Sequence, residues 1–468
     1  MQNLTIQVFS NRGISANFSR MEYGKLYRKL FAITLPIMIQ NLISSSLSFV
    51  DTLMIGQLGQ DQIAAVGIAN QVFFFISLFF FGIASGTSIW ISQFYGSGEY
   101  EKMERTMSFA SMICLIGATL MSVFSFLRPD LIMKIFTDDI NVIEPGVEYL
   151  RIVAVSYIFS SIAQTLSIGF RGIGKAHIPM IATFISLTLN AIGNYLLIFG
   201  IGPFPQMGVG GAALATTIAR MLEFLIVAYF TWHGKTPFAF HHTSFHWSRD
   251  FRKQFTITCL PVVLNEVLWA TGMILYKVAY SKLGTEALAT INISEAIANF
   301  FFIAMMGIGN GATILLGNIL GSGDRETAIA LSRRILVITV TIGFITGILE
   351  ALTAPLFASW FNVSATVIAA AATCLRINAL QQPIKSFNMA NIVGILRSGG
   401  DTRAAMLIEV FGLYAVGIPL SFVAVIFFHA PLSAVYAITA LEEGTKLVLG
   451  YLRYRKGHWA KVLTSKAA

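Results

Sequence analysis

Charged residues are scarce in this sequence. Of its 468 residues, only 12% are Asp, Glu, Lys or Arg, whereas 55% are hydrophobic and the mean hydropathy is +0.71. An ordinary soluble domain carries about one-quarter charged residues. The composition therefore excludes an ordinary soluble globular protein and predicts a membrane protein.

Cysteines are also few. Cys114, Cys259 and Cys374 each lie inside an apolar segment, without the spacing of a metal or redox motif. The net charge of +9 comes from short basic clusters between apolar runs, which argues against nucleic-acid binding. The first 30 residues lack the apolar core and cleavage site of a signal peptide, so we expect none.

Enzymatic motifs are missing as well. The run Gly169-Phe-Arg-Gly-Ile-Gly174-Lys175 has the spacing of a phosphate-binding loop, but Ala176 replaces the Ser or Thr that holds Mg²⁺. A true loop of this kind also follows a strand, whereas this run follows an apolar segment. The sequence shows neither a metal cluster nor a nucleophile paired with a base. We therefore expect no enzymatic activity and no cofactor.

What the sequence does contain is an internal repeat. Residues 36–98 align without a gap on residues 261–323, a shift of 225 positions (261 − 36). The glycines coincide along this alignment: Gly59 with Gly284, Gly82 with Gly307, Gly86 with Gly311, Gly96 with Gly321, and Gly98 with Gly323. A period this long is too great for a solenoid and is typical of the repeats in secondary transporters.

Apolar segments of about 20 residues, enough to cross a bilayer, occur six times in each half. The predicted spans are 30–55, 62–93, 106–127, 147–171, 178–200 and 209–232, then 256–281, 287–318, 332–353, 369–395, 404–428 and 432–452. We predict an all-α membrane protein with twelve transmembrane helices in two parallel-repeat lobes of six. The lobes, 30–232 and 256–452, are joined by a solvated cytoplasmic linker, 233–255, and flanked by cytoplasmic tails, 1–29 and 453–468.

Lys and Arg gather in alternate loops, which indicates the orientation. The rich loops include Arg171 and Lys175, Arg397 and Arg403, and both tails. Cytoplasmic loops carry such an excess, so both termini are predicted to be cytoplasmic. An even number of helices in each half keeps the two copies in the same orientation. We expect a monomeric, multi-pass protein of the cell (inner) membrane.

Ionisable residues inside the spans are candidates for function, because placing a charge in lipid costs about 2.5–3.5 kcal/mol. Asp51, Glu266 and Glu295 lie in the first, seventh and eighth spans, and Asn190 and Asn194 share one face of the fifth. We predict that these five residues couple transport to an ion. A carboxylate with amide oxygens suits Na⁺, held by Asp51 and the two asparagines, whereas a buried acid can instead exchange a proton.

Structural roles remain open for each of these residues. Asp51 lies near a helix end, where it can cap a neighbour or meet water. Glu266 can form an ion pair with Lys385 or Lys277. The two asparagines can be ordinary interhelical hydrogen-bonding residues.

Other polar residues in the spans receive further predictions. The predicted substrate-binding residues are Asn41, Asn70, Tyr276, Gln381, Lys385 and Asn388. The predicted structural pairs are Arg220 with Glu223, and Lys446 with Glu442 and Glu443. Glu350 and Glu409 lie closer to predicted helix ends and receive no role.

Several short motifs carry a family resemblance. They are Phe49-Val50-Asp51-Thr52, Gly56-Gln-Leu-Gly59, Gln93-Phe-Tyr-Gly96-Ser-Gly98, Asn318-Ile-Leu-Gly321-Ser-Gly323 and Gly208-Val-Gly-Gly-Ala-Ala213. On these residues the sequence resembles the multidrug and toxic compound extrusion (MATE) family over nearly its whole length. The loop at Gly96–Arg105 does not fit the motif of the major facilitator group, the main competing twelve-helix architecture.

The resemblance implies two six-helix lobes in a V that export small organic cations in exchange for Na⁺ or H⁺ by alternating access. It implies acids at Asp51, Glu266 and Glu295. Two positions depart from the family pattern: Asn194 stands where one branch has Asp, and the tenth span carries Lys385 instead of an acid. The alternative is a flippase for an amphipathic lipid-linked substrate, which would require a large basic cavity. Lys277, Arg376 and Lys385 are a small version of such a set.

Overall fold

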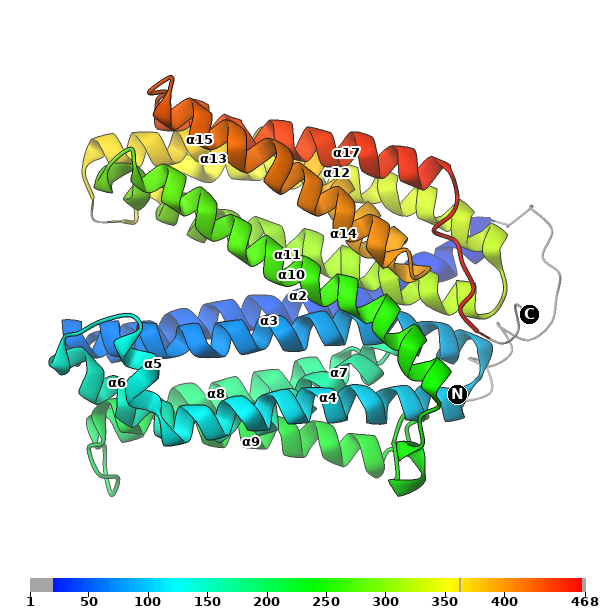
Figure 1. Cartoon of the computed structure of the whole chain (residues 1–468), viewed down its shortest axis with the longest axis horizontal. Coiled ribbons are helices and arrows are strands. Elements are labelled where there is room, and N and C mark those ends of the chain that lie inside the picture. The colour runs from blue at the N-terminus through cyan, green and yellow to red at the C-terminus, as the bar shows by residue number, and fades with distance from the viewer. Residues whose placement is uncertain (1–19, 362, 465–468) are drawn as a thin grey trace. The chain divides into compact units, whose positions relative to one another are not determined.

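Long apolar runs become long helices, because a backbone in lipid must satisfy its own N–H and C=O groups. The structure, a computed structural model, describes residues 20–361 and 363–464. Over these residues the chain is helical and contains no strand (Figure 1). The all-α prediction is confirmed. Most of the predicted N-terminal tail lies outside the described residues.

The chain divides into two compact units. Unit 1 consists of the described parts of Met1–Thr34, Ser92–Gly98 and Gln254–Ala468. Unit 2 consists of Leu35–Ile91 and Glu99–Lys253. Unit 1 therefore holds most of the second half of the chain together with two short segments of the first half.

Unit 2 is built from helices of the first half of the chain. They are α2 (Arg20–Gly56), α3 (Gln60–Ser97), α4 (Tyr100–Leu127), α5 (Pro129–Lys134), α6 (Ile140–Val153), α7 (Ser156–Gly172), α8 (His177–Phe199), α9 (Gly208–Trp232) and the short 3₁₀ helix η1 (His242–Phe245). The first turns of α2 and the last turns of α3 belong to unit 1. Gly200, in the left-handed conformation that glycine favours, ends α8.

Unit 1 contains the helices of the second half. They are α10 (Arg249–Ser281), α11 (Thr285–Gly321), α12 (Arg325–Ala358), α13 (Ala365–Asn388), the π-helix η2 (Met389–Leu396), α14 (Thr402–Val410), the π-helix η3 (Phe411–Gly417), α15 (Ile418–Ile426), α16 (Leu432–Ala437) and α17 (Thr439–Arg455). Side-chain caps set two of the starts. Asp324 accepts the Thr327 N–H at 2.9 Å before α12, and Ser364 accepts the Val367 N–H at 3.4 Å before α13.

Every one of the twelve predicted spans is occupied by helix. Among the described residues, nine helices are long and apolar enough to cross a membrane, and α6 with α7, bent by 50°, makes a tenth. The other two predicted spans are the continuous run of α13 and η2, and α16 followed by α17. Their buried polar and charged residues, including Gln381, Gln382, Glu442 and Lys446, explain why they are less apolar.

Many large apolar side chains lie on the outside of the helices. Leu352, Leu380 and Phe428 are 74%, 81% and 76% exposed. Apolar side chains this exposed are costly in water and favourable against lipid tails. Their exposure fits a multi-pass membrane protein.

Aromatic side chains of the predicted linker, residues 233–255, pack against helices of unit 2. Phe238 is fully buried and packs edge-on against Phe170, with ring centroids 5.0 Å apart. Trp247 packs against Phe109 at 5.0 Å and donates its indole N–H to the Arg105 carbonyl at 3.1 Å. These aromatic side chains cover apolar surface on α4 and α7, while most of the polar residues between them are exposed, so a solvated cytoplasmic crossover stays a prediction.

Within unit 1, the two copies of one glycine motif make a reciprocal contact. A side chain on Gly96 would collide with the backbone carbonyl of Asn318, and one on Gly321 would collide with that of Gln93. The repeat shift places Gly96 on Gly321 and Gln93 on Asn318, so each glycine meets the first residue of the other copy's motif. The end of α3 and the end of α11 therefore approach at backbone distance, which only glycine permits.

Candidate functional site

The carboxylate of Asp51 lies beside Asn194 in unit 2. Asp51 is half-buried in the last turns of α2, and Asn194 on α8 is 1% exposed. The Asn194 side chain donates its amide N–H to Asp51 Oδ1 at 2.5 Å. Asn194 Oδ1 is buried and, among the described residues, has no hydrogen-bond partner. A carboxylate and an amide oxygen with unused acceptor capacity thus lie together inside the span.

Asn190, one helical turn before Asn194, is also buried. Its side chain donates to the Thr216 hydroxyl on α9 at 3.3 Å. Asn70 on α3 accepts a long hydrogen bond, 3.4 Å, from the hydroxyl of the buried Tyr149 on α6. Polar groups from five helices of unit 2 are therefore engaged with one another around Asp51 or beside it, although their roles in transport stay predictions.

A second polar chain crosses unit 2 near the middle of α2. Arg171 donates to Gln40 Oε1 at 2.8 Å, and Gln40 donates to the Thr183 hydroxyl at 2.8 Å. Thr183 in turn donates to Glu223 at 2.6 Å, and Arg220 donates to Glu223 at 3.1 Å. The predicted pair of Arg220 and Glu223 is confirmed. Asn41 is half-buried next to Gln40 on the same helix.

Glu266 of α10, in unit 1, has a basic partner. Its Oε1 accepts hydrogen bonds from both terminal nitrogens of Arg397 at 3.1 Å. The proposed pairing of Glu266 with Lys385 or Lys277 was wrong. Arg397, which we assigned to a cytoplasmic loop, is only 2% exposed. Arg397 directly follows η2, most of whose residues are buried, so Arg397 lies inside the unit and not in solvent.

The same guanidinium faces a second acid. Glu409 of α14 lies 4.0 Å from Arg397 and accepts the Asn265 amide N–H at 2.8 Å. Asn265 Oδ1 is buried and lacks a hydrogen-bond partner among the described residues. When both acids are ionised, two carboxylates share one guanidinium, so this cluster carries one excess negative charge.

Glu295 of α11 forms an ion pair with Lys277 of α10 at 2.9 Å. The two side chains are 28% and 43% exposed. The position of Glu295 is compatible with a role in coupling or with a structural role.

Glu350 of α12, which received no role from the sequence, is the most deeply buried acid among the described residues. It is 0% exposed and accepts hydrogen bonds from Asn378 at 2.7 Å and from Gln382 at 2.5 Å. Lys385 donates to Asn378 Oδ1 at 2.5 Å. Glu350 lies inside the predicted span 332–353, so the cost of an ionisable residue in lipid was the signal that it deserved a role despite its place near the helix end.

This network continues from α13 to α17 and α10. Asn388 donates to Glu443 at 2.7 Å, Lys446 pairs with Glu443 at 3.3 Å and also with Glu442, and Tyr276 donates to Glu442 at 2.5 Å. The predicted pairs of Lys446 are confirmed. With Glu350 and Lys385 included, the network contains three acids, Glu350, Glu442 and Glu443, and two lysines, Lys385 and Lys446. When all five are ionised, the network carries one excess negative charge.

Four predicted substrate-binding residues belong to this network or lie beside it. Tyr276, Gln381 and Asn388 are 3%, 3% and 4% exposed, and Lys385 is half-buried. Gln381 accepts a hydrogen bond from Thr439 at 3.1 Å. In this conformation the first three contact protein on nearly all sides.

Transition-metal chemistry has no ligand set here. In the part of the chain that the structure describes, no group of three or more His, Cys, Asp or Glu lies close enough together to hold a metal ion.

Comparisons with known proteins agree with the repeat. The family model described as MatE matches residues 36–196 and 261–423, once in each half of the chain. A protein named "Uncharacterized transporter YisQ" from Bacillus subtilis is 25% identical over 431 residues, 92% of this chain and 94% of its own. "Probable multidrug resistance protein NorM" from Thermotoga maritima is 24% identical over 443 residues, 94% of both chains.

Solved structures share the fold. The structure described as "Crystal structure of MATE in complex with MaL6" superposes with a TM-score of 0.85 at 19% identity, over 92% of this chain and 96% of that one. A transporter from Pyrococcus furiosus, described as having a reversed polarity of its binding pocket, gives 0.84 at 20% identity, over 92% and 95%. Both show that this chain shares the fold of these solved proteins.

Proposed function

Because this chain belongs to the MatE family of multidrug efflux transporters, we propose that it exports small organic cations in exchange for Na⁺ or H⁺. The family is one of ion-coupled membrane transporters, not of enzymes. The proposal adds the charge of the substrate and the residues that bind the coupling ion. We propose that the protein lies in the cell (inner) membrane with both termini in the cytoplasm.

The observation that carries the proposal is the pairing of Asp51 with Asn194. The buried Asn194 Oδ1, without a hydrogen-bond partner among the described residues, lies on the same side chain that binds the Asp51 carboxylate at 2.5 Å. An unsatisfied buried acceptor costs about 1–3 kcal/mol, and a bound cation would remove that cost. Asp51, Asn194 and Asn190 are thus our ligands for Na⁺, and Asp51 is our site for H⁺.

Coupling follows from competition for one negative charge. An ion changes a conformational equilibrium only if it binds one state more tightly than the other. A neutralised Asp51 attracts an organic cation less than an ionised one, so the inorganic ion and the substrate exclude one another. Glu266, Glu409 and Arg397 together carry one excess negative charge. We therefore propose Glu266, which lies in unit 1, as the second coupling acid. Glu295 is the third, with its charge already balanced by Lys277.

The predicted substrate-binding residues keep that role in the proposal, with a division between the units. Asn41 and Asn70 offer amides in unit 2. Tyr276, Gln381, Lys385 and Asn388 would contact substrate only after the buried unit 1 network has rearranged, since three of the four are almost fully enclosed.

The flippase alternative has less support. It relied on a basic set that includes Lys277 and Lys385, but Lys277 is bonded to Glu295 and Lys385 to Asn378. A phosphate-bearing substrate would have to compete with these partners. In each of the two buried clusters of unit 1, acids outnumber basic residues by one, which favours cations instead.

Transport in proteoliposomes tests the proposal. We expect uptake of a fluorescent organic cation by the wild-type protein under an imposed Na⁺ gradient or pH gradient, applied separately, and loss of at least about tenfold in Asp51→Asn, equivalent to about 1.4 kcal/mol. Asp61→Asn is the matched control, because Asp61 is exposed at the start of α3 and undergoes the same chemical change.

A second variant separates the ions. If Na⁺ is the coupling ion, Asn194→Ala should raise the Na⁺ concentration needed for half-maximal transport while Asp61→Asn leaves it unchanged. If H⁺ is the coupling ion, transport should follow the pH gradient and ignore Na⁺. Wild-type transport by Asp51→Asn under both gradients would contradict the proposal.

A further inference from the structure

Residues 456–464, here called the C-terminal segment, pack along unit 1 after α17 (Figure 1). Trp459 is 1% exposed and stacks on Tyr454 at a centroid distance of 6.1 Å. It belongs to the same hydrophobic core as residues of α11, α12, η2 and α14. The Trp459 carbonyl lies against Gly399, where any side chain would collide with it. The fold therefore fixes the position of this segment.

A single buried side chain holds the segment at two further points. Gln93, 0% exposed, donates to the Ser398 carbonyl at 2.8 Å and to the Lys461 carbonyl at 3.1 Å. The Leu463 N–H donates to Gln93 Oε1 at 2.7 Å. The backbone is thus fixed on both sides of Val462, which gives the glutamine of the repeated glycine motif a specific structural role.

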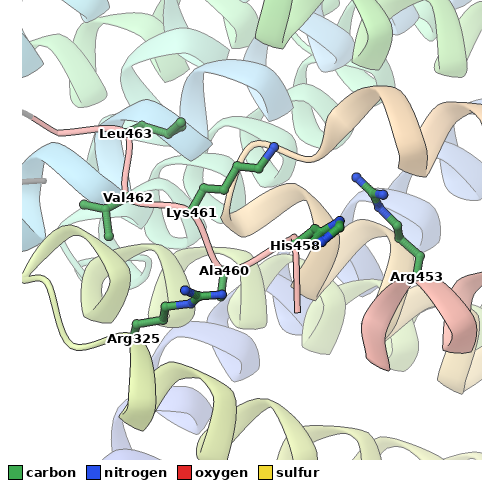
Figure 2. A pocket seen from close by; sticks show the side chains of 7 residues that line it. All are labelled: Arg325, Arg453, His458, Ala460, Lys461, Val462 and Leu463. Carbon is green, nitrogen blue, oxygen red and sulfur yellow. The ribbon is translucent and has the colours of Figure 1, made fainter. Parts of the chain in front are cut away.

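The segment forms one wall of a basic pocket of about 630 Å³. The lining residues are Arg325, Arg453, His458, Ala460, Lys461, Val462 and Leu463 (Figure 2). Figure 2 shows Arg325 and Arg453 on two different helices, with the C-terminal segment carrying His458 and Lys461 between them. Four basic and three apolar residues thus line the pocket.

The charges in this pocket are unevenly compensated. Arg453 forms two hydrogen bonds with Asp401, at 2.6 and 2.9 Å, so its charge is balanced. Arg325 donates to the neutral Gly457 carbonyl at 3.2 Å. Among the described residues, the Lys461 ammonium has neither a hydrogen bond nor an ion pair. Two positive charges therefore remain without a bonded acid.

The nearest acid in sequence does not neutralise Arg325. Asp324 uses its carboxylate to cap α12, where it accepts the Thr327 N–H at 2.9 Å. Arg325 is the first residue of α12, so it also lies where the partial positive charge of that helix is greatest. Helix and side chain together favour an anion.

We propose that this pocket binds a phosphate group, carried by an anionic lipid headgroup or by a soluble phosphate ester. The planar fork of arginine and the ammonium of lysine are the usual phosphate ligands in proteins. Ala460, Val462 and Leu463 offer apolar contact to the carbon skeleton that carries the phosphate. The predicted orientation puts the pocket on the cytoplasmic side, where basic sites bind lipid phosphates.

Binding here would join three parts of unit 1: the start of α12, the end of α17 and the C-terminal segment. None of the residues involved belongs to the coupling site around Asp51 in unit 2. The proposal therefore stands or falls independently of cation export.

The test uses the purified full-length protein in detergent. Thermal stability and native mass spectrometry are measured with phosphatidylglycerol, with phosphatidylcholine, with glycerol 3-phosphate and with inorganic phosphate. The pocket variant is Arg325→Gln with Lys461→Gln. Its matched control is Arg455→Gln with Lys456→Gln, which removes the same two charges from exposed residues outside the pocket lining.

We expect the wild-type and control proteins to bind at least one phosphate probe, and the pocket variant to bind it at least about tenfold more weakly, equivalent to about 1.4 kcal/mol. Loss confined to phosphatidylglycerol identifies a lipid headgroup, and loss for glycerol 3-phosphate or phosphate identifies a soluble ligand. Equal binding by pocket variant and control would overturn the proposal, as would failure of every phosphate probe to bind the wild type. If the double variant fails to fold, Lys461→Gln alone repeats the test at an exposed side chain.

Discussion

The buried acid Glu350 provides the sharpest test of how unit 1 is held together. Its carboxylate accepts hydrogen bonds from Asn378 and Gln382, and Asn378 in turn accepts one from Lys385. Glu350→Leu keeps the approximate volume of the side chain but removes both acceptor oxygens. Two amide N–H donors are then left buried beside a lysine without their acid.

The cost can be worked out from these contacts. Each buried donor left unsatisfied costs about 1–3 kcal/mol, so Glu350→Leu should cost about 2–6 kcal/mol. Glu350→Gln keeps one acceptor oxygen and loses one hydrogen bond to a charged group, which costs about 1.5–3 kcal/mol. We therefore expect the leucine variant to be less stable than the glutamine variant, and both to be less stable than the wild type.

The assay is thermal unfolding in mild detergent. For a unit of about this size, 1 kcal/mol lowers Tm by about 2–4 °C, so a loss of about 3 kcal/mol lowers it by about 6–12 °C. Thr353→Val is the control on the same helix, because Thr353 is only half-buried and its hydroxyl bonds to the Leu349 carbonyl one turn back, at 2.7 Å.

A Glu350→Leu protein as stable as Thr353→Val would refute the reasoning. So would a glutamine variant that loses more stability than the leucine variant, because that order would mean that the carboxylate is not the acceptor for both amides. In either case, the network would not depend on this acid.

Two further substitutions in unit 1 have defined outcomes. Gly321→Ala should lower Tm or prevent expression, because its methyl group would collide with the Gln93 carbonyl. The control Gly444→Ala has open space around it and should leave Tm within about 2 °C, or about 0.5–1 kcal/mol. Equal Tm values for the two variants would exclude the close contact. Lys446→Met should cost about 3–5 kcal/mol, because two carboxylates lose their ammonium. Adding Glu442→Gln should recover part of the lost Tm, and no recovery would argue against the ion pair.

The helices were predictable because the bilayer dictates them. A span needs about 20 apolar residues, and this requirement is visible in one dimension along the sequence. The repeat added a second line of argument, since a segment recognised in one half locates its copy in the other. Asp51 and Asn194 lie in contact, as expected of polar residues in spans with few other partners, and their joint role in transport stays a prediction.

Side-chain partners were less predictable than helices. Glu266 and Arg397 are 131 positions apart (397 − 266), and nothing in their local sequence says that their helices meet. Arg397 looked like a loop residue because it follows an apolar run and precedes two glycines. Phe238 and Trp247 looked like linker residues because their neighbours are polar. The four aromatic side chains within residues 238–247 were nevertheless a signal of burial.

The reciprocal contact of Gly96 and Gly321 has a consequence for biosynthesis. A ribosome adds about 5–20 residues per second, so the end of α11 follows the end of α3 by about 10–45 s. During that interval the last turn of α3 has been synthesised, but it cannot yet contact the end of α11. A nascent chain of this protein thus needs protection by lipid or by the insertion machinery until the later copy of the motif arrives.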